Sequence, residues 1–107
     1  MLSVDQDGLG AFSAVGEVSD DRVTVTVTGE VDMSTADAMF RAATPQGVRG
    51  ATLDLTAVTF FDSAALHALI RLNERYPGGL RVITSAQVHR VLDISGLSTQ
   101  PWVTHPA

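Results

Sequence analysis

The clearest pattern along the chain is a strict alternation of apolar and polar residues. Residues 23–28 read Val-Thr-Val-Thr-Val-Thr, which places three valines on one face of a strand and three threonines on the other. Residues 51–56 repeat this alternation, with apolar side chains at Ala51, Leu53 and Leu55. Because each strand has one polar face, we expect helices to cover only one side of the sheet.

Three further segments are strand candidates. Residues 12–18 precede the Val-Thr strand and are joined to it by Ser19-Asp20-Asp21, a polar turn short enough for an antiparallel hairpin. Residues 80–84 predict another strand, and residues 102–104 predict a short final one.

Segments with apolar residues at helical spacing lie between the later strands. Residues 34–43 predict a first helix, with Asp32 or Ser34 as its N-cap. Residues 63–76 predict a second helix, whose apolar stripe consists of Ala65, Leu69, Leu72 and Tyr76. A third helix begins at Ser85 or Ala86 and ends before Gly96, which is suited to a left-handed C-cap.

Strands and helices in this order predict an α/β fold. A helix between successive strands gives a parallel crossover, so the sheet is expected to be mixed, with four to five strands and helices mainly on one face. Residues 11–107 are expected to form a single domain, and residues 1–10, which are polar and acidic, a flexible lead-in.

Composition narrows the classes of partner. The formal net charge is −5, and all seven basic residues are arginines, no two of them adjacent. We therefore expect no nucleic-acid partner, since no basic stripe could follow a phosphate backbone. No membrane association is expected either, because an acidic surface is repelled by anionic lipid and no apolar run approaches about 18 residues. The first residues lack the features of a signal peptide, so a cytoplasmic location is expected.

The candidate chemistry lies where the second helix begins. Asp62 is placed to cap the first free amides, which puts Ser63 at the first helical position. Helix geometry then directs Ser63 outward, on the face shared with His67, Ile70 and Glu74. Ser63 is either an ordinary first-turn serine or a modification site, and Ile70 is either part of a partner footprint or a scattered surface residue.

A phosphate on Ser63 would suit this position. The start of a helix offers free amides and the positive end of the helix dipole, so the fold would tolerate the added group. The surface would change more than the fold, because phosphoserine adds about −1.5 to −2 charges next to Asp62.

Other chemistries lack their motifs. Ser63, His67 and Asp62 superficially suggest hydrolysis, but the sequence has no G-x-S-x-G elbow. The chain contains no cysteine, and its three histidines show no metal-ligand spacing. Its glycines form no phosphate-binding loop. We therefore expect neither enzymatic activity nor a cofactor or metal.

Three motifs in order resemble the STAS domains, and among them the bacterial anti-sigma factor antagonists. The first is Thr28-Gly29-Glu30-Val31-Asp32, the second runs from Leu53-Asp54-Leu55 to Phe61-Asp62-Ser63, and the third is residues 91–97, Val-Leu-Asp-Ile-Ser-Gly-Leu. The resemblance spans residues 12–103, and the ordered set is more specific than any one motif.

The resemblance implies a partner switch in transcription regulation. The unphosphorylated protein would bind an anti-sigma factor that is also a serine kinase of the histidine-kinase-like ATPase type, and phosphorylation at Ser63 would end that interaction. The resemblance carries the phosphate acceptor over to Ser63 and an acidic recognition residue over to Asp32. With the start of the second helix as the rest of the docking surface, the expected partner-binding residues are Asp32, Asp62, Ser63, Ala64, His67 and Ile70. Ala64 and Ala65 depart from the family pattern, which has a hydroxyl residue and a glycine there. A monomer or weak dimer is expected.

Two alternative functions remain open. One is an unphosphorylated STAS subunit that serves as a fixed scaffold in a signalling or lipid-transport assembly, a role that Ala64 and Ala65 would allow. The other is a sensor of a small ligand or nucleotide, which would require a concave apolar pocket.

Overall fold

The computed structural model describes residues 12–106. The predicted lead-in of residues 1–10 lies outside the described residues. In chain order the elements are β1 (Phe12–Ser19), β2 (Arg22–Val31), α1 (Ala36–Ala42), β3 (Gly50–Phe61), α2 (Ser63–Arg75), β4 (Leu80–Thr84), α3 (Ala86–Ile94) and β5 (Val103–Thr104).

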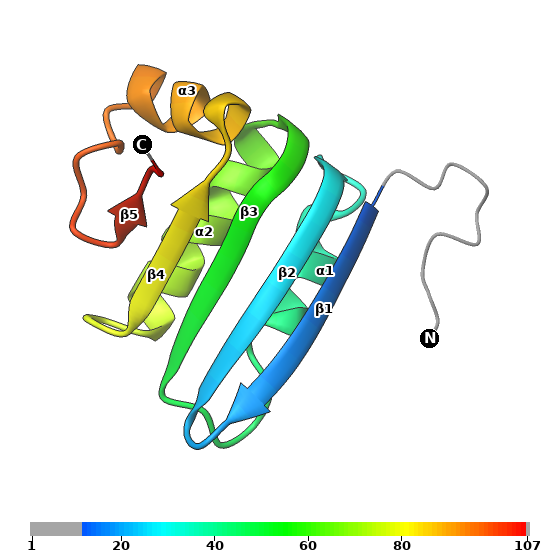
Figure 1. The fold of residues 1–107 in the computed structure, drawn as a ribbon, viewed down its shortest axis with the longest axis vertical. Helices are drawn as coiled ribbons and strands as arrows, with labels where there is room; N and C mark the ends of the chain where they lie inside the picture. The colour runs from blue at the N-terminus through cyan, green and yellow to red at the C-terminus, as the bar shows by residue number, and fades with distance from the viewer. Residues whose placement is uncertain (1–11, 107) are drawn as a thin grey trace.

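The strands form one mixed sheet. Its order is β1-β2-β3-β4-β5; β1 pairs antiparallel with β2, and every later neighbour is parallel. The hairpin turns at Asp20, which adopts a positive φ of 59° that aspartate tolerates better than most residues. Helices α1 and α2 lie behind the sheet in Figure 1, and α3 crosses its upper end. The predicted α/β fold, with a mixed sheet and helices on one face, is therefore confirmed.

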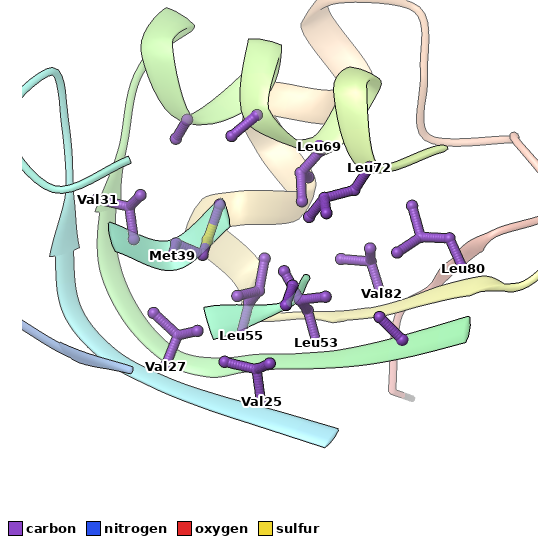
Figure 2. Packing of buried hydrophobic residues seen from close by; sticks show 14 of the residues in the cluster. Val25, Val27, Val31, Met39, Leu53, Leu55, Leu69, Leu72, Leu80 and Val82 are labelled. Carbon is purple, nitrogen blue, oxygen red and sulfur yellow. The ribbon is translucent and has the colours of Figure 1, made fainter. Parts of the chain in front are cut away.

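The hydrophobic core fills the space between the sheet and the helices. The alternating valines of β2 are all buried, whereas Thr24, Thr26 and Thr28 on the opposite face are exposed. Figure 2 shows apolar side chains of the sheet and helices meeting in this layer, among them Val25, Val27, Leu53, Leu55, Met39, Leu69 and Leu72. Burial of this apolar surface is the main stabilising contribution to the fold.

Strand β3 is longer than its alternation predicts. The predicted strand ended at Thr56, but β3 continues to Phe61. Its pairing with β2 shifts register at two places, each of which leaves one extra residue on β3. Such bulges change which side chains face inward, so buried residues in this half are three apart, at Leu55, Val58 and Phe61. A search for period-two alternation therefore stops too early.

The first helix also differs from its prediction. Helix α1 begins at Ala36 rather than Ser34, and its N-cap position is Thr35, with no side-chain cap. The prediction of Asp32 or Ser34 as N-cap was wrong, because the two side chains bond each other in the preceding turn, from Ser34 Oγ to Asp32 Oδ1.

Both termini of α3 agree with prediction. Ser85 caps α3 by accepting a hydrogen bond from the amide of Val88. Gly96 follows α3 with a φ of 78°, and the amide of Leu97 donates to the carbonyl of Leu92 at 2.7 Å. These contacts form the left-handed ending that the sequence predicted.

Candidate functional site

The candidate site lies at the carboxyl ends of two neighbouring strands. The last residues of β2 and β3, Val31 and Phe61, are paired, and the amide of Asp62 donates to the Val31 carbonyl at 3.3 Å. The loop after β2 and the start of α2 therefore emerge side by side, at the upper end of the sheet in Figure 1. Residues separated by about 30 positions in sequence are brought together here.

Asp62 organises the first turn of α2. Its backbone is extended, and its side-chain Oδ1 accepts hydrogen bonds from the amides of Ala64 at 3.0 Å and Ala65 at 3.2 Å. Its carbonyl accepts from the amide of Leu66 at 3.0 Å, the first bond of the helix. The predicted N-cap is confirmed, and Ser63 is the first helical residue, as the sequence indicated.

The Ser63 side chain is exposed to solvent. Within residues 12–106, its hydroxyl makes no hydrogen bond to another residue, because Asp62 already accepts from the amides that a first-turn serine could otherwise cap. The hydroxyl oxygen is therefore accessible to an external reagent.

The remaining predicted residues of α2 differ in exposure. His67 and Glu74 are exposed, as their place on the outer face requires. Ile70 is half-buried, and Ala64 is half-buried against the core. The surface around Ser63 therefore consists mainly of the first two turns of the helix, with Ile70 at its margin.

The loop after β2 is held by its own side chains. Asp32 Oδ1 accepts from the Ser34 amide at 2.9 Å and from the Ser34 hydroxyl at 2.7 Å. The Thr35 hydroxyl accepts from the Asp32 amide at 2.9 Å and donates to the Glu30 carbonyl at 3.0 Å. The hydrogen bonds from Ser34, followed by those from Thr35, lower the pKa of the Asp32 carboxyl. Asp32 is therefore a carboxylate at neutral pH.

This loop displays an apolar residue that sequence reasoning missed. Met33 lies between Asp32 and Ser34, and its side chain is 83% exposed. Phe60, just before the β3 terminus, is also partly exposed. The sequence did offer one indication of this exposure: Met33 is a large apolar residue between two polar residues that favour turns. Single exposed hydrophobic residues are common, but this one is held in a hydrogen-bonded turn beside the start of α2.

The described residues provide neither a metal-binding cluster nor a large pocket for a small ligand. Within the described part of the chain, no group of three or more His, Asp or Glu side chains is arranged to hold a metal ion. A hollow of about 130 Å³ lies beyond the opposite end of α2, lined by Asn73, Gly78, Leu80, Pro101 and Trp102. Sites for small molecules usually enclose about 300–1,000 Å³, so this hollow gives the sensor alternative no support.

None of the helices in residues 12–106 has both the length and the apolar character needed to cross a membrane.

Removing the cap should destabilise the fold measurably. Asp62→Ala leaves the amides of Ala64 and Ala65 without their acceptor, and we expect the free energy of unfolding to fall by about 0.5–2 kcal/mol. Urea denaturation of the two proteins measures the difference. Asp62→Ser keeps an acceptor oxygen and should lose less, so an alanine variant as stable as the serine variant would contradict the capping role.

Comparisons with known proteins identify the family and support the fold. The family model described as "Mlab, STAS domain" matches residues 15–104. No curated protein matches the chain. Among solved structures, an anti-sigma factor antagonist from Mycobacterium paratuberculosis is similar at 26% identity and a TM-score of 0.76, over 91% of this chain and 87% of that one.

Two solved forms of another antagonist share the fold. Unphosphorylated SpoIIAA is 24% identical with a TM-score of 0.65, over 91% of this chain and 89% of that one. The phosphorylated form of Bacillus SpoIIAA is 23% identical with a TM-score of 0.63, over 91% of this chain and 92% of that one. The family match over most of the sequence shows that the chain belongs to the STAS domain family.

Proposed function

We propose that this protein is an anti-sigma factor antagonist controlled by phosphorylation. Its docking surface consists of the Asp32 loop and the start of α2, including Asp62, Ser63, Ala64, His67 and Ile70, and its partner is an anti-sigma factor that is also a serine kinase of the histidine-kinase-like ATPase type. The observation that carries this proposal is the exposed Ser63 hydroxyl, which makes no hydrogen bond within residues 12–106 and lies beside the hydrogen-bonded Asp32 loop. The similarity to a mycobacterial antagonist supports the same function.

The phosphoryl transfer needs little from this chain beyond access. The Ser63 oxygen would attack the γ-phosphorus of ATP bound to the kinase, while the bond to the ADP leaving group breaks and the hydroxyl proton passes to a base on the kinase. A phosphate on Ser63 would lie near the amides and positive dipole end of α2, so the fold of this chain would be retained.

The same phosphate would weaken docking. It adds about −1.5 to −2 charges at a surface where the carboxyl groups of Asp32 and Asp62 already stand at the ends of adjacent strands. A partner surface suited to the unmodified site would then face excess negative charge. Like charges brought together at an interface cost several kcal/mol, and each 1.4 kcal/mol weakens binding about tenfold.

Mapping the modified residue tests the proposal. The full chain is incubated with ATP and, separately, with each purified serine kinase of the histidine-kinase-like ATPase type from its host, and mass spectrometry locates the phosphate. We expect one phosphate, on Ser63. Exposed Ser34, in the adjoining loop, serves as an internal control and should remain unmodified. Modification at another residue, or none with any of these kinases, would contradict the proposal.

A fixed scaffold role is the second candidate. Ala64 and Ala65 replace the hydroxyl residue and glycine of the family motif, and Ala65 is fully buried under the start of α2. Half-buried Ala64 keeps the Ser63 hydroxyl but changes the exposed surface beside it. If Ser63→Glu leaves the assembly from the host intact and the native protein carries no phosphoserine, the scaffold role is favoured over the switch.

A further inference from the structure

Strand β1 presents a long unpaired edge. It lies at one end of the sheet order, and within residues 12–106 no strand pairs with its outer side. Figure 1 shows β1 as the outermost strand of the sheet. With respect to the described part of the chain, its outward backbone amides and carbonyls are therefore available to another strand.

The side chains of β1 do little to block such pairing. Val15 is 63% exposed and Val18 is 56% exposed, although both belong to a regular strand. Residues 12–19 contain no lysine, arginine or proline, the residues that commonly protect sheet edges, and Glu17 is their single charged residue. Directly paired residues of neighbouring strands point to the same face. Val15, paired with Thr26, therefore faces the threonine side, while Val18, paired with Val23, faces the helix side.

We propose that a second copy of this chain pairs with the edge, so that two β1 strands lie antiparallel about a two-fold axis at Val15. In this register Val15 lies opposite Val15 of the second copy, Phe12 opposite Val18, and Ser13 opposite Glu17. Each face of the new pairing then receives an apolar cross-strand contact, and the two Glu17 carboxylates do not oppose each other.

Neighbouring registers are less favourable. An axis at Gly16 places Val15 opposite Glu17, and an axis at Glu17 sets two carboxylates directly against each other. A two-fold axis that passes between two residues would place a threonine-side residue of one strand opposite a helix-side residue of the other. Directly opposed strand residues must point to the same face, so these registers are excluded. The side-chain pattern therefore selects a second copy of β1 in one register, and closed two-fold pairing is the commonest symmetry of protein dimers.

The dimer should be weak and sensitive to salt. A single strand pair buries little surface, which is typical of transient interfaces. Each chain carries a net charge of −5, so the copies repel each other at low ionic strength and added salt should strengthen association. This inference does not rest on the proposed function, because it concerns β1 and can be tested with the chain alone.

Sedimentation equilibrium of the full chain at increasing concentration tests the interface. We expect Val15→Lys to raise the dissociation constant by at least about tenfold, because it opposes two ammonium groups at the axis. Ile94→Lys is the matched control: Ile94 is 79% exposed on α3, and its substitution should leave the dissociation constant within about threefold. Circular dichroism checks that both variants fold.

Cysteine variants test the register, since the natural chain has no cysteine. Under mild oxidation Val15→Cys should form a disulfide between copies, because directly opposed strand residues lie within the usual Cα separation for a disulfide. Val18→Cys has similar exposure but lies opposite Phe12, so it should crosslink far less. Equal crosslinking by both variants would overturn the register. A chain that stays monomeric at every concentration, or a Val15→Cys chain that forms no disulfide between copies, would overturn the proposal.

Discussion

Ser63→Glu is expected to weaken binding to the kinase by at least about 100-fold, which corresponds to about 2.8 kcal/mol. The added carboxylate would lie beside the cap residue Asp62 and near the ionised Asp32 loop, and would meet a partner surface suited to a neutral hydroxyl. Like-charge contacts at an interface cost enough for a loss of this size. Isothermal titration calorimetry with the purified kinase measures the change.

Ser63→Ala, measured in the same experiment, separates the effect of added charge from the effect of losing the hydroxyl. It removes the hydroxyl without adding charge, and that hydroxyl makes no hydrogen bond within residues 12–106, so the variant should bind nearly as well as the natural chain and accept no phosphate. Ser95→Glu makes the same charge change on an exposed residue at the end of α3 and should leave binding unchanged. Equal affinity of the Ser63→Glu and Ser63→Ala variants would rule out a switch based on charge.

Leu53→Ala should cause the largest loss of stability. Leu53 is fully buried in the middle of β3, between the paired strands β2 and β4. Its truncation removes apolar contacts and leaves a cavity that a central strand cannot readily close. We expect the free energy of unfolding to fall by about 2.7–5 kcal/mol, a large part of the roughly 5–15 kcal/mol typical of a native protein.

Urea denaturation with a matched surface truncation measures this effect. Ile94→Ala removes a similar number of apolar atoms from a side chain that is 79% exposed, so its free energy of unfolding should stay within about 0.5 kcal/mol of the natural value. A loss below about 1 kcal/mol for Leu53→Ala would indicate that the core around β3 can rearrange.

The sequence by itself determined those features that depend on neighbouring residues. Alternation in residues 23–28 identified β2 and its buried face, and the order Asp62-Ser63 identified the start of α2 and its cap. Both patterns are short-ranged: the period of two follows from strand geometry, and a cap acts on amides two and three residues away. The exposed position of Ser63 followed from the same local geometry.

Only the tertiary structure decided where these pieces meet. The bulges of β3 changed which of its residues face inward and carried the strand to Phe61, and the pairing of that residue with Val31 placed the Asp32 loop beside Ser63. The position of β1 at the sheet edge likewise depends on strand order. Strand order and register arise from packing between residues distant in the chain, and no local periodicity encodes them.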